Sequence, residues 1–151
     1  MEVIIAVFVI TVGLLAVLGL INFLLNSAQS SKDNLVAAEL AQEGVEIVRS
    51  MRDSQDDWTA WFQSPPVGNW QVQYNTDNSH PLVAYSGSNY LKYDSASGLY
   101  QYSVGENTQF LRKVTISKIS DNQAKVSVDI SWKFKGSDRH FILEDRLWRW
   151  Q

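Results

Sequence analysis

Few side chains in this sequence have the types and spacing that enzymatic chemistry requires. The two histidines, His80 and His140, lie far apart along the chain, and there is no cysteine. A catalytic base normally needs a nucleophile and an orienting group within hydrogen-bond reach, and the sequence indicates no companion for either histidine. Without cysteine, disulfides, thiolate metal sites and cysteine nucleophiles are excluded. We therefore predict no catalytic residue and no enzyme activity.

Three neighbouring carboxylates are the residues that could suggest a metal site. Asp53, Asp56 and Asp57 offer the oxygen ligands that calcium prefers. They lack the spacing and the glycine of a known calcium loop, so a solvated helix end is the simpler interpretation. We predict neither a metal nor a cofactor.

The charge balance argues against nucleic acid as a partner. The chain has 13 Lys and Arg residues against 16 Asp and Glu residues, and its net charge is −3. Nucleic-acid binding needs a basic surface that neutralises phosphates. Lys125, Lys133 and Lys135 are better explained as the solvated face of a sheet, so no strong nucleic-acid binding is expected.

Glu2 stands apart from the other acids. It is the only acidic residue before position 27, and it precedes a run, residues 3–25, that has no charged side chain. A carboxylate at the end of an apolar helix is costly in hydrocarbon unless it is paired. In the simplest interpretation it lies at a helix N-terminus, where the macrodipole favours a negative charge.

Residues 3–25 form an apolar segment long enough to cross a membrane. At about 1.5 Å per residue, a helix over this segment spans roughly 34 Å, and the hydrocarbon core of a bilayer is about 30 Å thick. A cleaved signal peptide fits less well, because its apolar region is usually about 7–15 residues long and follows a basic segment. Basic residues are also expected on the cytoplasmic side of a membrane helix, so we expect that a leader upstream has been removed.

Helical periodicity continues beyond the apolar run. Residues 34–53 contain no proline and carry small or apolar residues at alternating steps of four and three, which indicates an amphipathic helix. We predict one helix from about residue 2 to residue 52. Its first half is apolar all round. Its second half has an apolar stripe formed by Ala37, Ala41, Gly44, Val48 and Met51.

The remainder of the chain indicates antiparallel strands. Residues 53–69 are interpreted as a helix end followed by a loop. In residues 125–134, apolar and polar side chains alternate, which predicts a strand with one buried face. Short turns on both sides predict an antiparallel meander, and the apolar stripe of the helix would cover its buried face. The expected strands are 70–74, 90–93, 99–104, 112–119, 125–134 and 139–148.

The predicted fold class is therefore α+β, a long N-terminal helix packed through its second half on a C-terminal antiparallel sheet. We expect two parts. The first is an apolar transmembrane helix, residues 1–26. The second is a globular head, residues 27–151, made of the second helical half, an αβ loop and the meander. These three segments are residues 27–53, 54–105 and 110–149.

Two short segments resemble the type IV pilin family. Residues 2–16, EVIIAVFVITVGLLA, are similar to its N-terminal segment, in which one acidic residue opens a long apolar helix. Residues 40–46, LAQEGVE, are similar to the second helical half of minor-pilin-like sequences. The chain departs from the family in two ways: the glutamate is its second residue rather than the fifth of a mature chain, and many pilins close their C-terminal region with a disulfide. The family's N-methylation is therefore not carried over to Met1.

The resemblance implies a pilin-like fold and a structural role in an extracellular helical filament that serves adhesion, motility or DNA uptake. Residues 1–26 would then be the filament core, and Glu2 would set subunit register by pairing with a neighbouring subunit's terminal amine. The implied partners are further copies of the chain, the inner membrane before assembly, and an assembly platform, a prepilin peptidase and ATPases acting in trans. The implied location is the cell surface, with a membrane-inserted precursor pool.

Gly13 and Gly19 interrupt the apolar helix, where glycine costs roughly 1 kcal/mol relative to alanine. One interpretation is close helix packing. The other is a pair of weak points at which the helix unwinds in the filament, as in several pili.

Two rival functions remain open from the sequence. A pseudopilin of a type II secretion system has the same architecture with a short periplasmic filament. A single-pass membrane-anchored binding domain would use the apolar helix as an anchor only.

Overall fold

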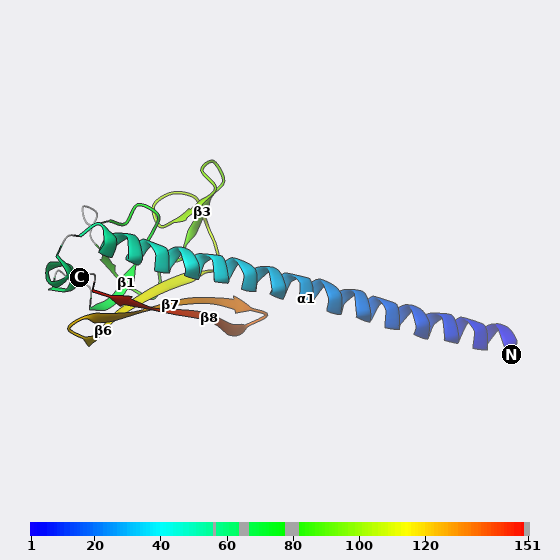
Figure 1. Ribbon diagram of the computed structural model, residues 1–151. Coiled ribbons are helices and arrows are strands. Elements are labelled where there is room, and N and C mark those ends of the chain that lie inside the picture. Colours follow the sequence, from blue (N-terminus) through cyan, green and yellow to red (C-terminus); the bar gives the residue numbers. More distant parts are fainter. Residues whose placement is uncertain (56, 64–66, 78–81, 150–151) are drawn as a thin grey trace. The chain divides into compact units, whose positions relative to one another are not determined.

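The computed structural model describes residues 1–55, 57–63, 67–77 and 82–149 (Figure 1). The chain divides into two compact units, Met1–Leu35 and Val36–Gln151. Helix α1 (Glu2–Asp53) contributes to both units, and all of the strands belong to the second. The remaining elements are α2 (Trp58–Gln63), β1 (Gly68–Gln71), β2 (Val83–Ala84), β3 (Lys92–Asp94), β4 (Leu99–Gln101), β5 (Glu106–Asn107), β6 (Leu111–Ser120), β7 (Gln123–Phe134) and β8 (Ser137–Trp148).

Helix α1 confirms the single long helix predicted from the sequence. It ends at Asp53, one residue beyond the predicted end. At this end the Ser54 hydroxyl donates to Met51 O at 3.0 Å, and Gln55 N donates to Arg52 O at 3.1 Å. These bonds satisfy carbonyl groups of the last turn that have no partner within the helix.

The larger sheet has five antiparallel strands in the order β2-β1-β6-β7-β8. Its last three strands form the predicted meander. A two-residue turn joins β7 to β8, and both of its residues have positive φ, 52° at Lys135 and 80° at Gly136. Turns of this kind match the twist of paired strands, so β7 and β8 stay in register from Phe134↔Ser137 to Gln123↔Trp148.

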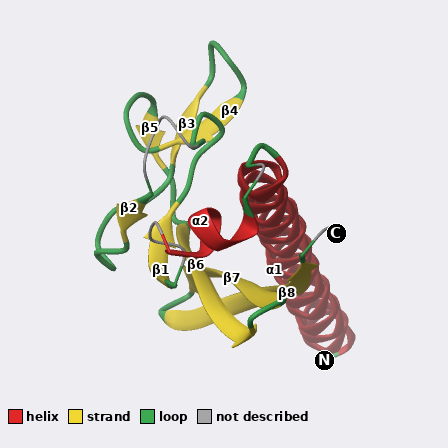
Figure 2. Ribbon diagram, turned by 60° about the vertical axis from the view of Figure 1, so that its left-hand side comes forward, coloured by secondary structure: helices red, strands yellow, loops and turns green. Residues whose placement is uncertain are grey.

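The core of the second unit lies between the apolar stripe of α1 and one face of this sheet (Figure 2). The alternating residues of β7 are buried as predicted, with Val126, Val128 and Ile130 fully enclosed. At Gly44 the helix backbone lies close to the sheet. A Cβ atom at this position would lie 3.0 Å from Val128 Cγ1, so the glycine lets the helix backbone approach the strand.

A second, three-stranded sheet has the order β4-β3-β5. The hairpin predicted around residues 94–98 is present, with Asp94 paired to Leu99, although both strands are shorter than expected. Asp94 accepts hydrogen bonds from Ala96 N and from the Ser97 hydroxyl, which is typical of aspartate in a turn.

Two local predictions were wrong. The segment expected to be a loop, residues 53–69, contains α2, and Trp58 and Trp61 of this short helix are buried in the core. The strand expected at residues 70–74 instead runs from Gly68 to Gln71. It ends early because Thr76 closes a turn on Gln73, with Thr76 N donating to Gln73 O at 2.8 Å and Gln73 N donating to the Thr76 hydroxyl at 2.9 Å.

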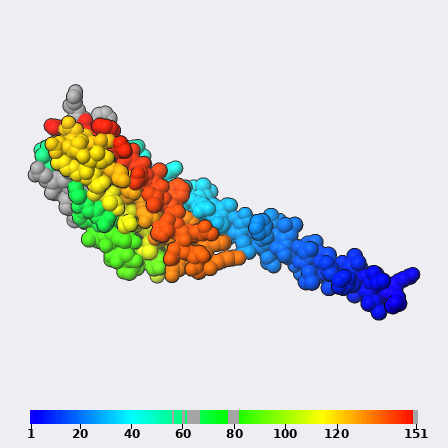
Figure 3. All heavy atoms as spheres, turned by 90° about the horizontal axis from the view of Figure 1, so that it is seen from below, coloured from blue at the N-terminus to red at the C-terminus, as the bar shows by residue number. Residues whose placement is uncertain are grey.

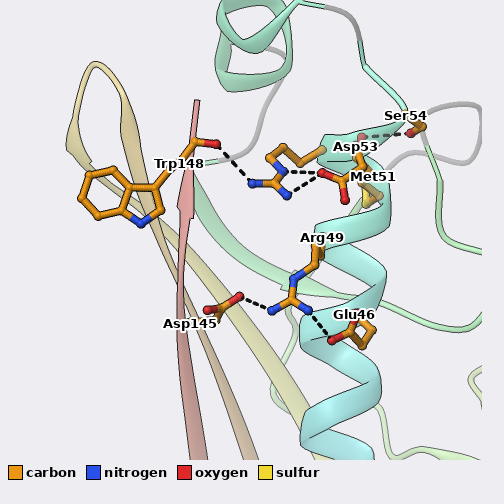
Figure 4. Close-up of polar contacts among 8 residues, drawn as sticks. Glu46, Arg49, Met51, Asp53, Ser54, Asp145 and Trp148 are labelled. Carbon is orange, nitrogen blue, oxygen red and sulfur yellow. Dashed lines mark hydrogen bonds and ion pairs between the residues drawn. The ribbon is translucent and has the colours of Figure 1, made fainter. Parts of the chain in front are cut away.

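Charged side chains hold the end of α1 along the edge strand β8 (Figure 4). Arg49 donates to Asp145 of β8 at 2.8 Å and to Glu46 at 2.7 Å. One turn later, Arg52 donates to the main-chain oxygen of Trp148 at 3.1 Å. The hydrogen bond to Asp145 raises the pKa of Arg49.

Candidate functional site

The first unit presents its apolar side chains on every side of the helix. Every residue from Met1 to Leu25 is exposed, and Val3 and Leu25 have 74% and 64% of their surface accessible (Figure 3, blue). By length and composition, α1 can cross a membrane. A soluble helix normally confines its apolar residues to one stripe. An all-round apolar helix needs lipid or other helices around it.

Glu2 is the first residue of α1 and is exposed. The first backbone N–H groups of a helix have no partner within it, and they carry the positive end of the macrodipole. The carboxylate therefore lies where a negative charge is favoured, as the simplest interpretation of the sequence requires. The same exposed position leaves it accessible to a cation of another chain.

Gly13 and Gly19 both lie in unbroken helix. A Cβ atom added to either glycine would meet nothing within 4 Å. The single chain therefore gives no packing reason for the two glycines. The Thr11 hydroxyl near Gly13 donates back to Val7 O at 2.7 Å, a bond that lets a polar side chain lie in an apolar helix.

A fully buried cation joins helix and sheet in the second unit. Arg112 of β6 donates through Nη1 to Leu40 O at 3.2 Å and to Glu43 Oε2 at 2.8 Å. Its Nη2 donates to Val72 O at 2.6 Å, while Nε has no hydrogen-bond partner among the described residues. The Arg112 side chain is 0% exposed and that of Glu43 is 32% exposed. This buried cation was not among the residues predicted from the sequence. The sequence feature that could have indicated it is strand alternation. Arg112 lies two residues before Val114 and four before Ile116, so all three side chains point to the buried face of β6.

Tyr102 also contacts Arg112. Its hydroxyl donates to Arg112 O at 3.3 Å. Burial raises the pKa of the Tyr102 phenol, so the donor proton is retained at physiological pH. Internal acceptors bind both Nη atoms of Arg112, and only Nε is left without a partner among the described residues, so the arrangement indicates a structural role.

The expectation that His140 lacks a companion was wrong. His140 Nδ1 lies 3.0 Å from Asp129 Oδ1 on the neighbouring strand, and Lys113 Nζ lies 3.5 Å from Asp129 Oδ2. Asp129 and His140 are diagonal rather than directly opposite in the β7–β8 register, a relation that sequence spacing alone does not reveal. His80 lies outside the described residues.

The suggested calcium ligands have other roles where they are described. Asp53 accepts from Arg52 Nε at 2.6 Å, and Asp57 accepts from Thr59 N at 2.8 Å, capping α2. Asp56 lies outside the described residues. Within the described part of the chain, no three His, Asp or Glu side chains are grouped so that they could hold a metal ion.

The lysines singled out from the sequence lie at the sheet surface. Lys125 forms an ion pair with Glu144 at 3.0 Å, and Lys133 and Lys135 are exposed near the β7–β8 turn. The hydrogen bond from Lys125 lowers the pKa of Glu144.

No protein-family model, curated protein or solved structure matches this chain.

Proposed function

We propose that this chain is a structural subunit of a type IV pilus-like helical filament, held in the membrane by residues 1–26 before assembly. The observation that carries the proposal is the change of character within α1. The helix is apolar and exposed all round up to Leu25, and it then becomes the core helix of an α+β head. A subunit of this kind has one part for polymerisation and one part for display.

The exposed apolar segment needs lipid or other helices around it to keep its side chains away from water. Burying one large aliphatic or aromatic side chain contributes about 1.5–3 kcal/mol, and residues 3–25 present such side chains on every side. Lipid provides this cover for a single chain. In a filament, the same helices of neighbouring subunits provide it, so a subunit can leave the membrane without exposing apolar surface to water.

In this proposal, Glu2 fixes the axial register between neighbouring subunits of the filament. Apolar packing is nondirectional, so helices that slide past one another lose little contact area. A carboxylate among apolar helices is favourable only where it meets a cation. Pairing with the terminal amine of a neighbouring subunit therefore selects one axial offset, and the filament grows by identical heterologous contacts.

The direct test is to shear surface filaments from the producing cells and to identify their subunits by mass spectrometry. The proposal requires filaments in which this chain is the main component. Short periplasmic filaments would indicate a pseudopilin. A chain that stays in the membrane fraction as a monomer would indicate an anchored binding domain and overturn the proposal.

The Glu2→Ala variant tests the register role. It removes the charge but leaves the apolar segment intact, so membrane insertion should persist while filament yield falls at least tenfold. Membrane fractionation and filament counts by electron microscopy measure the two effects. Glu39→Ala, at an exposed position of the head helix, is the matched control. Normal filament numbers from Glu2→Ala would leave only the macrodipole role.

A further inference from the structure

A pocket whose described lining carries no charge lies in the head beside the end of β1. Its volume is about 450 Å³, within the range of roughly 300–1,000 Å³ typical of small-molecule sites. Most of its accessible surface is apolar, and six of the eight described lining residues carry an amide or an aliphatic hydroxyl group: Gln71, Gln73, Asn75, Thr76, Asn89 and Ser103. We call this the amide pocket.

Hydrogen bonds already fix the two glutamines of the amide pocket at both ends of their amide groups. Gln71 Oε1 accepts from Asn89 Nδ2 at 3.2 Å, and Gln71 Nε2 donates to the Ser86 hydroxyl at 3.4 Å. Gln73 Oε1 accepts from Tyr102 N at 2.9 Å, and Gln73 Nε2 donates to Asn75 Oδ1 at 2.7 Å. Side chains held in this way lose little conformational freedom when a ligand arrives.

The same network leaves polar groups open at the edge of the pocket. Asn75 uses its Oδ1 as an acceptor and Asn89 uses its Nδ2 as a donor. Among the described residues, Asn75 Nδ2 and Asn89 Oδ1 have no hydrogen-bond partner. One free donor and one free acceptor therefore lie at the same pocket. Asn75 is exposed and Asn89 is half-buried, so both can reach a ligand from solvent.

The amide pocket differs from other pockets of the head in its charge. One pocket is lined by Lys133, Asp138 and His140, another by Glu43 and Glu46. None of the described residues that line the amide pocket is charged, although 19% of the chain is charged. An ionic ligand would lose hydration there without gaining a counter-charge.

We propose that the amide pocket binds a neutral saccharide. A sugar hydroxyl donates one hydrogen bond and accepts others, and an amide side chain offers both functions. Val83 and Tyr102 complete the lining, and they provide apolar surface for the C–H groups of a pyranose ring. This combination of mixed donors and acceptors, apolar contact and no charge fits an uncharged polyhydroxyl ring better than an ion or a lipid.

The test uses the full chain in micelles of a detergent without a sugar head group. Saturation-transfer NMR is recorded with glucose, galactose, mannose and N-acetylglucosamine. At least one of these neutral sugars should receive transfer at millimolar concentration. Its uronate and amino-sugar relatives should bind about tenfold more weakly, because a charge would be desolvated without a partner. Absence of transfer to every neutral sugar, or equal binding of the charged relatives, overturns the proposal.

Two variants locate the binding. Asn75→Asp keeps the size of the side chain and the acceptor for Gln73 Nε2, but it replaces the free donor by a negative charge. We expect about tenfold weaker binding of the neutral sugar, equivalent to about 1.4 kcal/mol. Asn107→Asp, on exposed β5 outside the amide pocket, is the matched control and should bind as the unaltered chain does.

Thermal unfolding of both variants keeps the result interpretable. Matching unfolding temperatures together with selective loss in Asn75→Asp support the proposal, and equal binding by the two variants overturns it. If Asn75→Asp unfolds early, Asn75→Ser is used in its place, with the same expected loss. The measurement needs no filament, so its outcome is separate from that of the proposed function.

Discussion

At the scale of single residues, Arg112 shows how a charge can take part in a core. Three acceptors from two segments, Leu40 O and Glu43 of α1 and Val72 O after β1, converge on its guanidinium group. A buried cation is costly unless it is paired and hydrogen-bonded. Because the acceptors lie on α1 and on the chain after β1, the cation also specifies where these segments meet β6.

Replacing Arg112 should therefore destabilise the head strongly. For Arg112→Met we expect a loss of about 3 kcal/mol in the free energy of unfolding. This is the lower end of the range for breaking a buried ion pair, since Glu43 is one-third exposed. Urea denaturation measures it. Arg146→Met, on the exposed face of β8, should change stability by about 0.5 kcal/mol or less. Similar small losses for both variants would contradict the structural role.

Exposed carboxylates predict how stability depends on pH. Hydrogen bonds from Ser97, Lys118 and Lys125 lower the pKa values of Asp94, Asp121 and Glu144 in the folded state. The folded protein then binds fewer protons than the unfolded chain near the ordinary carboxylate pKa of about 4. Their stabilisation is complete at neutral pH and is lost as the pH falls through the lowered values.

We therefore expect the unfolding temperature to be level near neutrality and to fall below about pH 4. Differential scanning calorimetry across this interval measures the slope. Lys125→Gln removes the main cause of the lowered pKa of Glu144, so its decline with acid should be shallower. A variant with the same acid slope as the unaltered chain would show that this ion pair is too well solvated to contribute.

At the scale of elements, the two halves of α1 meet different requirements. From Ala37 to Met51 the apolar stripe packs on a sheet of the same chain. From Val3 to Leu25 the side chains are exposed in the single chain, so burying them requires lipid or other chains. One secondary structure is kept throughout, because a helix satisfies its backbone hydrogen bonds internally in either surrounding.

The glycines of the first half are predicted to matter only after assembly. Gly13→Ala with Gly19→Ala meets no steric obstacle in the single chain and favours helix by roughly 1 kcal/mol at each position. Membrane insertion should be unchanged. Filaments should lose an unwound stretch near residues 13–20 and should extend less under force. Cryo-electron microscopy and single-filament pulling measure these effects.

A matched control for the glycine pair is Ala6→Ser with Ala16→Ser, two small-residue changes in the same segment. It should leave filament extension as it is in the unaltered chain. A map of the unaltered filament with unbroken helical hydrogen bonds from Glu2 to Met51 would contradict the unwinding. Close packing between subunits would then be the remaining explanation of Gly13 and Gly19.

At the scale of the whole molecule, the second unit carries a core of its own. Its buried residues come from α1 after Leu35, from α2, from the strands and from residues next to strand ends, and they form one cluster. Burial of apolar side chains in such a cluster is the main favourable term in folding. The head should therefore not depend on the first unit for its fold.

A fragment that begins at Ala28 tests this independence. We expect a soluble monomer that unfolds in one cooperative transition and forms no filaments, because the apolar segment proposed to form the polymer core has been removed. Size-exclusion chromatography with light scattering and circular dichroism measure mass and unfolding. The full chain in detergent is the comparison. Filaments formed by the fragment alone would show that the helix is not the polymer core.

Sequence alone determined the features that depend on local periodicity. The unbroken apolar run predicted the first half of α1, and the alternation in residues 125–134 predicted β7 with its buried face. These elements follow because side chains repeat at the period of the helix or of the strand, whatever packs against them. The pairing of helix stripe and sheet followed from the need of each apolar face for a cover.

Tertiary structure alone decided the features that join distant parts of the chain. The acceptors of Arg112, the companion of His140 and the convergence of Gln71, Asn75 and Asn89 on one pocket depend on which strands become neighbours and in which register. The need for a glycine at position 44 likewise depends on Val128 of β7, whose Cγ1 would lie 3.0 Å from an added Cβ atom. The physical cause is that directional bonds and close contacts need atoms placed to within a few tenths of an ångström, and residue spacing along a chain does not carry that information.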